Sequence, residues 1–118
     1  MSNSSITIYH NPRCSKSRQT LELIRAAGIE PTIVEYLKTP PSSKELEGLL
    51  RKLNLEPLDL MRRKEAIFRE MGLASKDLSR DEAIAVMAEN PVLIERPIVV
   101  RGSKAVIGRP PENVQELL

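Results

Sequence analysis

The sequence has 118 residues and a mass of 13.2 kDa, enough for one domain that buries roughly two thirds of its unfolded surface. It contains no run of about 18 apolar residues, and its N-terminus carries neither a basic nor an apolar segment, so neither a membrane span nor a secretory signal is expected. The 18 Lys+Arg and 16 Asp+Glu residues are interleaved and only 3% of residues are aromatic, which disfavours nucleic-acid binding. The single cysteine cannot form an internal disulfide, so we expect a cytoplasmic protein.

The first part of the chain predicts a strand, a helix and a second strand. β-Branched residues alternate along segment 5–9, Asn11-Pro12 indicates a turn, and a helical pattern follows over 15–27 and ends at Gly28. Segment 31–37 predicts the second strand. A strand–helix–strand unit of this length is typical of parallel pairing. The residues expected on one face of the helix are Thr20, Leu23, Ile24 and Ala27.

The middle of the chain predicts helices only. Ser42 precedes Glu45, and Ser79 precedes Glu82, at the spacing of a capping box, so each serine is expected to start a helix. The predicted helical segments are 42–53, 58–63, 64–71 and 79–90.

The end of the chain predicts a hairpin and a short helix. Strands are expected at 98–100 and 105–107, joined by a four-residue connection at 101–104 that contains glycine, and a helix is expected at 111–117. The order β-α-β, helical insert, β-β-α predicts an α/β fold with a central sheet. We therefore expect a single domain over residues 1–118, with a helical insertion at about 42–90.

Cys14 is the candidate nucleophile, because it lies where the first strand ends and the first helix begins. Unpaired N–H groups and the helix dipole stabilise a thiolate there, and Arg13, Lys16 and Arg18 add positive potential. We therefore expect the pKa of this thiol to lie below the free value of about 8.5. The same N–H groups can hold a tetrahedral oxyanion. The alternative, that Cys14 is a small buried hydrophobic residue, fits its polar neighbours poorly.

Two further features concern the chemistry of this thiol. His10, the only histidine, could tune the thiol or transfer a proton, or it could be a strand-end side chain that contacts solvent; both interpretations stay open. The C-x-x-S motif that begins at Cys14 has no second thiol, so oxidised Cys14 cannot be resolved within the chain. Redox chemistry would therefore need a thiol from glutathione, a glutaredoxin or a thioredoxin.

Three arginines are predicted at the ends of elements: Arg62 in a helical turn, Arg96 before Pro97 and Arg109 before Pro110. A guanidinium presents a planar fork of donors that suits bidentate contacts with an oxyanion. Taken singly, each is better explained as a solvated surface arginine. The pattern alone does not distinguish these three from the other arginines.

Four motifs occur in the order YHNPRCSKSR at 9–18, LMR at 60–62, ERPIVV at 95–100 and IGRP at 107–110. Together they resemble the ArsC family, the glutaredoxin-coupled arsenate reductases and their close relatives, and the similarity runs almost from end to end. The sequence is most similar to the short, arsenate reductase-like YfgD branch of that family. The resemblance implies a thioredoxin-like fold with an inserted helical subdomain.

The resemblance also implies a role for each matched position. Cys14 would attack arsenate, His10 would lower the pKa of the thiol, and Arg62, Arg96 and Arg109 would bind the oxyanion. Glutathione, as co-substrate, would attack the adduct on the cysteine, and glutaredoxin would reduce the mixed disulfide; no bound cofactor or metal is implied. Pro97 would be the cis-proline beside the thiol. The remaining matched positions that could support the site are Asn11, Arg13, Ser15 and Ser17.

Two alternatives to arsenate reduction stay open. The related Spx regulators share the implied fold but act by binding RNA polymerase, and fold alone does not choose between binding and catalysis. Many Spx proteins carry a C-x-x-C switch, which this chain lacks, and the three arginines favour anion chemistry. The other alternative is a glutathione-dependent thiol oxidoreductase that is not specific for arsenate. We expect an arsenate reductase.

Overall fold

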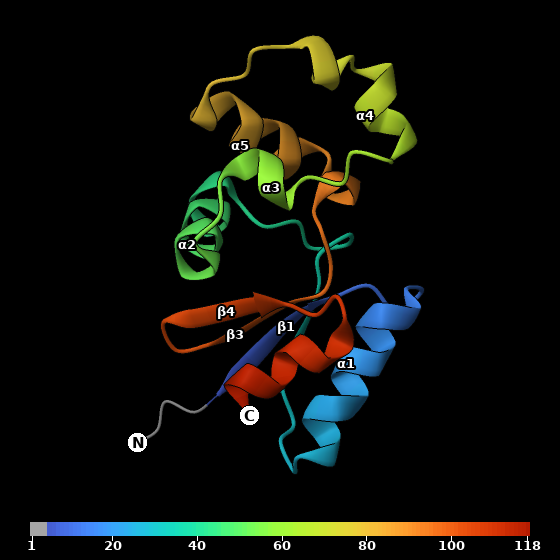
Figure 1. Cartoon of the computed structure of the whole chain (residues 1–118), viewed down its shortest axis with the longest axis vertical. Helices are drawn as coiled ribbons and strands as arrows, with labels where there is room; N and C mark the ends of the chain where they lie inside the picture. The colour runs from blue at the N-terminus through green and yellow to red at the C-terminus, as the bar shows by residue number, and fades with distance from the viewer. Residues whose placement is uncertain (1–4) are drawn as a thin grey trace. The chain divides into compact units, whose positions relative to one another are not determined.

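The computed structural model describes residues 5–118 (Figure 1). The chain forms two compact units. One, the sheet unit, comprises the chain up to Thr39 together with Arg96–Leu118, and the other, the helical unit, comprises Pro40–Glu95. The helical unit contains the segment 42–90 in which a helical insertion is expected. That the whole chain is one domain stays a prediction.

The sheet unit is built on four strands in the order β2-β1-β3-β4. β1 (Ile6–His10) pairs in parallel with β2 (Thr32–Glu35), as the strand–helix–strand pattern predicts. On its other side β1 pairs antiparallel with β3 (Ile98–Arg101), which pairs antiparallel with β4 (Lys104–Ile107). β1 is therefore a central strand, and its carboxyl end lies between β2 and β3.

The connection between β3 and β4 is shorter than predicted. Arg101 and Lys104 are paired strand residues, so only Gly102 and Ser103 form the turn instead of the four residues expected. Gly102 has φ of 63°, the left-handed conformation that a two-residue hairpin requires and that glycine adopts without strain. Because the flanking charged residues can pair their backbones, they belong to the strands.

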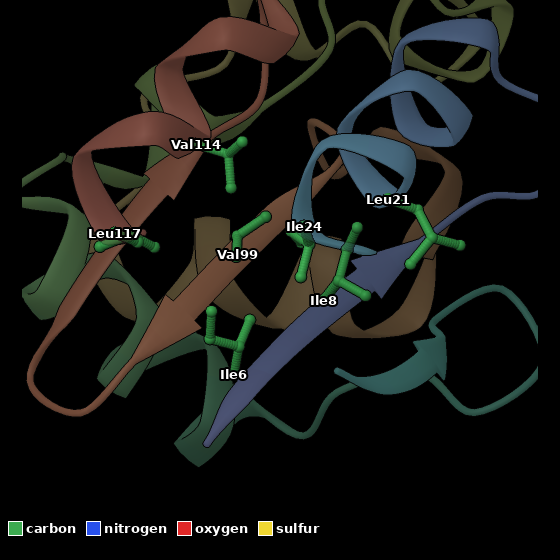
Figure 2. Packing of buried hydrophobic residues seen from close by; sticks show 7 residues of the cluster. All are labelled: Ile6, Ile8, Leu21, Ile24, Val99, Val114 and Leu117. Atoms are coloured by element: carbon green, nitrogen blue, oxygen red, sulfur yellow. The ribbon is translucent and has the colours of Figure 1, made fainter. Parts of the chain in front are cut away.

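One face of the sheet is covered by α1 (Ser15–Ala26) and by the 3₁₀ helix η3 (Pro111–Leu117), which takes the place of the α-helix predicted at the C-terminus (Figure 1). Of the residues expected on one face of α1, Thr20 and Ile24 are buried, Leu23 is half-buried and Ala27 is exposed, while Leu21 is buried as well. The core residues between these layers are Ile6, Ile8, Leu21, Ile24, Val99, Val114 and Leu117 (Figure 2).

The helical unit contains both helices that the capping boxes predict. Ser42 and Ser79 each accept a hydrogen bond from the backbone of the glutamate three residues later, and that glutamate bonds back to the serine backbone. The described elements are α2 (Ser43–Leu53), α3 (Pro57–Leu60), α4 (Ala66–Glu70), η1 (Leu73–Ser75), α5 (Arg80–Glu89) and η2 (Pro91–Leu93). None of the helices within residues 5–118 is both long and apolar enough to cross a membrane.

Arg62 does not lie in a helical turn, contrary to the prediction. α3 ends at Leu60, and Met61 is extended and forms an isolated bridge with Ile94. The Arg62 N–H then donates to the Leu93 carbonyl at 2.6 Å. A contact with a segment distant in the sequence stops the helix here, which a local helical pattern cannot anticipate.

Candidate functional site

Cys14 is the residue that caps the N-terminus of α1. Its backbone is extended, with φ of −95° and ψ of 123°, and its N–H donates to the Asn11 carbonyl at 3.0 Å, so a tight turn joins β1 to α1. The thiol is half-buried, and it is a free cysteine. The first N–H groups of α1 follow this residue directly and have no partner within the helix.

Two arginines from segments that are distant in the sequence lie beside this thiol. Arg109, which follows β4, donates from Nη1 to the Sγ of Cys14 at 3.8 Å and to the carbonyl of Arg96 at 3.5 Å. The Arg96 side chain also hydrogen-bonds the thiol. The predicted association of Cys14 with Arg96 and Arg109 is thus present in the sheet unit.

The pKa of Cys14 is lowered, in the direction expected. Burial of the thiol is the largest influence and acts against ionisation, but hydrogen bonds from the Ser17 backbone, the Arg96 side chain and the Lys16 backbone outweigh it. The charge of Arg96 adds to the effect. The side-chain cation that lowers the pKa of Cys14 is therefore Arg96, which lies far from the cysteine in the sequence. The sequence pattern instead predicts this effect from the cations next to the cysteine.

His10 is buried, with 6% of its surface exposed, and is not a solvent-facing side chain. Its Nδ1 lies 2.6 Å from the Oγ of Ser17, and this hydroxyl also accepts the Asn11 N–H at 3.1 Å. Ser17 is fully buried. The Ser17 backbone is among the groups that lower the pKa of the thiol, and His10 contacts the side chain of this same residue in the first turn of α1.

The pKa of His10 is lowered, chiefly because burial disfavours the imidazolium. Glu35, its partner across β1 and β2, acts in the opposite direction, and Arg25 and Arg18 lower the pKa further. His10 is therefore neutral at neutral pH. A neutral imidazole can share the hydroxyl proton of Ser17 without placing a charge in the core.

Pro97 and Gly108 hold the two arginine segments against α1. The Arg96–Pro97 bond is cis, as the resemblance implies, and so is the Arg109–Pro110 bond. The Gly108 N–H donates to the Pro97 carbonyl at 2.9 Å. A Cβ on Gly108 would lie 2.5 Å from the Oγ1 of Thr20, so only glycine lets the end of β4 approach α1 this closely.

The structure places Arg62 and Asn11, two other predicted site residues, in different units. Arg62 belongs to the helical unit, where its Nε pairs with Glu65 at 3.0 Å and its Nη1 with Glu95 at 2.6 Å. Its role in oxyanion binding stays a prediction. Asn11 is buried, and its Oδ1 accepts the Arg13 N–H at 3.0 Å, which shapes the loop before the cysteine.

The remaining predicted positions, Arg13 and Ser15, are exposed beside the cysteine. Within residues 5–118, His, Cys, Asp and Glu side chains form no group of three that could hold a metal ion. The candidate site brings together one thiol, backbone N–H groups and guanidinium groups, which is a set suited to a tetrahedral anion.

The sequence provided no reason to expect that Ser17 is buried. It also did not predict that Thr20 packs against Gly108. One signal was present: Ser17, Thr20, Leu21 and Ile24 follow the spacing of a single helix face, so the serine falls on the inward side. A polar residue at an inward position must find a hydrogen-bond partner. The nearest candidate, His10, ends the strand that this face covers.

Comparison with known proteins identifies relatives of nearly equal length. A model of the ArsC family matches residues 9–117. The chain is 50% identical over 114 residues to the uncharacterised protein YfgD of Escherichia coli K12, with 96% of each chain covered. It is 46% identical over 115 residues to an arsenate reductase of Haemophilus influenzae, covering 97% of this chain and 99% of the relative.

A solved structure agrees with this assignment. The arsenate reductase from Vibrio cholerae superposes with a TM-score of 0.94 at 51% identity, and 98% of each chain is covered. The four-stranded sheet with its helices is thus the thioredoxin-like α/β fold that the motifs predict. Since the family model spans almost the entire sequence, the chain belongs to the ArsC family.

Proposed function

We propose that this protein is an oxidoreductase that reduces arsenate to arsenite, with Cys14 as the nucleophile, glutathione as the thiol donor and a glutaredoxin as the final reductant. The observation that carries the proposal is the 3.8 Å contact between Arg109 Nη1 and the Sγ of Cys14, beside the hydrogen bond from Arg96. It joins a thiol of lowered pKa to donors that attract an oxyanion. The relatives named arsenate reductase support the choice of substrate.

The arginines make the first step feasible. The Cys14 thiolate attacks the arsenic atom, a sulfur–arsenic bond forms, and one arsenate oxygen leaves as water after taking up protons. Both reactants are anionic, so the approach is unfavourable unless positive charge lies at the same place. Arg96 and Arg109 supply that charge beside the sulfur.

The second step reduces arsenic. A glutathione thiolate attacks the Sγ of Cys14, a disulfide forms, and the electron pair of the sulfur–arsenic bond stays on arsenic, which leaves as arsenite in the +3 state. Glutaredoxin then takes the glutathione moiety by thiol–disulfide exchange and returns Cys14 to the thiol. An external thiol is required because Cys14 is the only cysteine of the chain. Such a cycle fits the reducing cytoplasm.

The test is a coupled assay with arsenate, glutathione, glutathione reductase, glutaredoxin and NADPH. Wild type is expected to consume NADPH only when arsenate and glutaredoxin are both present. Cys14→Ser is expected to lose this turnover by at least about a thousandfold and to keep its fold, because the residue lies at a half-buried loop–helix junction. Ser15→Ala, at the exposed neighbouring position, is the matched control and should remain active.

The lone cysteine also favours a second candidate, a glutathione-dependent thiol oxidoreductase that does not use arsenate. The same assay separates the two candidates. If Cys14 reacts with oxidised glutathione and glutaredoxin removes the adduct, while arsenate adds no NADPH consumption, arsenate reduction is wrong and the second candidate holds.

A further inference from the structure

A cavity of about 210 Å³ opens beside the loop that leads to Cys14, at the carboxyl ends of β1 and β2. Its lining includes His10 and Arg13 from the cysteine loop and Glu35, Leu37 and Lys38 from the end of β2. All of these residues belong to the sheet unit. The roles described above for the cysteine and its arginines do not use this cavity.

The cavity presents both signs of charge around a buried imidazole. Lys38 Nζ lies 3.4 Å from a carboxylate oxygen of Glu35, in an exposed pair, and the guanidinium of Arg13 makes no ion pair with any residue of 5–118. His10 is more than nine-tenths buried and lines the wall. Two cations and one carboxylate fit a ligand with two carboxylates and one ammonium group.

The sheet order places this cavity on the opposite side of the cysteine from the arginines. Arg96 precedes β3 and Arg109 follows β4, whereas the cavity lies toward β2, and β1 with its cysteine loop is between them. A thiolate that attacks a sulfur approaches in line with the bond that breaks. If the arginines hold the oxyanion on the β3 side, the second thiol must arrive from the β2 side.

The dimensions agree with a short peptide whose thiol is central. The cavity lining includes Arg13, and the Cα of the next residue, Cys14, is about 3.8 Å further along the chain. One residue of an extended peptide spans at most about 3.6 Å. The middle residue of a tripeptide held by its charged ends thus lies about one residue length from each anchor, which is comparable to the step along the chain from Arg13 to Cys14.

We propose that this cavity binds glutathione through its charged ends and directs its thiol to the face of Cys14 opposite the arginines. Arg13 and Lys38 take the two carboxylates, and Glu35 takes the ammonium group. The proposal rests on the proposed function, because it locates the thiol donor of the second step. In that step the glutathione sulfur bonds to Sγ, and the leaving group, arsenite or a second glutathione, departs with the electron pair.

The proposal is tested without arsenate, by the rate at which disulfides modify Cys14. Oxidised glutathione gives the mixed disulfide and releases one glutathione, and the product is counted by mass spectrometry. Bis(2-hydroxyethyl) disulfide, which is uncharged, measures the intrinsic reactivity of the thiol. Arg13→Gln and Lys38→Met are each expected to slow modification by oxidised glutathione about two- to fivefold, the effect of an exposed charge contact, and to leave the uncharged disulfide unaffected.

A third probe isolates the carboxylate of the cavity. The disulfide of N-acetylcysteine carries carboxylates but no ammonium group. Glu35→Gln is expected to slow oxidised glutathione about two- to fivefold without slowing the acetylated disulfide. Lys52→Met, at an exposed position of α2 in the helical unit, is the matched control and should change no rate.

Two results would overturn the proposal. Equal slowing of all three disulfides would mean that the substitutions act on the reactivity of the thiol, and the cavity would not be a glutathione site; an unchanged rate with oxidised glutathione would overturn it too. Arsenate turnover in the coupled assay decides the proposed function separately. A protein that prefers oxidised glutathione through Arg13, Lys38 and Glu35 but ignores arsenate would keep the cavity assignment and lose the substrate.

Discussion

The pKa of Cys14 is lowered because several donors lie beside its half-buried sulfur. Burial alone would raise its pKa, so the lowered pKa depends on the hydrogen bonds of the Ser17 N–H and the Arg96 side chain. The Ser17 N–H is fixed in turn by the contact of its hydroxyl with His10. At the scale of single residues, the thiol is thus tuned by groups that hold the first turn of α1 and the start of β3 in place.

Arg96→Ala is expected to raise the pKa of Cys14, because it removes a hydrogen bond and a positive charge that both favour the thiolate. The measurement is the rate of alkylation by iodoacetamide as a function of pH. The midpoint should move to higher pH in the variant. Arg63→Ala, at an exposed site of the helical unit, serves as the control. An unchanged midpoint in Arg96→Ala would show that the backbone donors alone stabilise the thiolate.

Strand β4 and helix α1 of the sheet unit pack against each other with almost no free space between them. The end of β4 lies against α1 at Gly108, where an added Cβ would be 2.5 Å from Thr20 Oγ1 and 2.9 Å from Pro97 Cγ. Those atoms belong to a helix and to the residue next to Arg96, so they cannot all move away. The close approach of β4 to α1 is what places Arg109, the following residue, beside Cys14.

Gly108→Ala is expected to lower the free energy of unfolding by about 1–3 kcal/mol and to reduce arsenate turnover, since overpacking displaces the Arg109 segment. Urea titration and the coupled assay measure the two effects. Gly48→Ala is the matched control: nothing lies within 4 Å of its added Cβ and it sits inside α2, so it should stabilise by about 0.4–1 kcal/mol. Wild-type stability in Gly108→Ala would refute the packing argument.

At the scale of the whole molecule, His10 links the site to the stability of the fold. Its pKa is lowered in the folded state from a reference value of 6.5, chiefly by burial, so the unfolded chain binds a proton that the folded chain resists. Its contribution is complete above pH 6.5 and is lost progressively as the pH falls toward the folded-state pKa. No other histidine exists in the chain to mask this effect.

The free energy of unfolding of the wild type is therefore expected to fall between about pH 7.5 and 5.5, and that of His10→Gln to fall less over the same range. Urea titrations at several pH values measure both slopes. The comparison of slopes separates the proton linkage from any constant loss of stability in the variant. Equal slopes would mean that His10 has the same pKa in the folded and unfolded chain.

Much of the secondary structure could be predicted, because its causes lie within a few residues. The serines at 42 and 79 bond the backbone three residues later, so a capping box is visible in the sequence. Gly28 ends α1 with φ of 83°, a conformation that glycine adopts at no cost. Arg62 shows the opposite case, since its backbone bonds Leu93, and no local pattern reveals that contact.

The sequence by itself singled out Cys14 as the candidate nucleophile and indicated the order of elements and, through its motifs, the family. The turn that places this thiol between a strand and a helix is local, so the sequence reveals it. Only the tertiary structure decided which cation tunes that thiol, that Ser17 and His10 are buried together, and that Gly108 brings Arg109 to the sulfur. These contacts join residues from separate elements, and their energies depend on distance and burial, which exist only after the chain has folded.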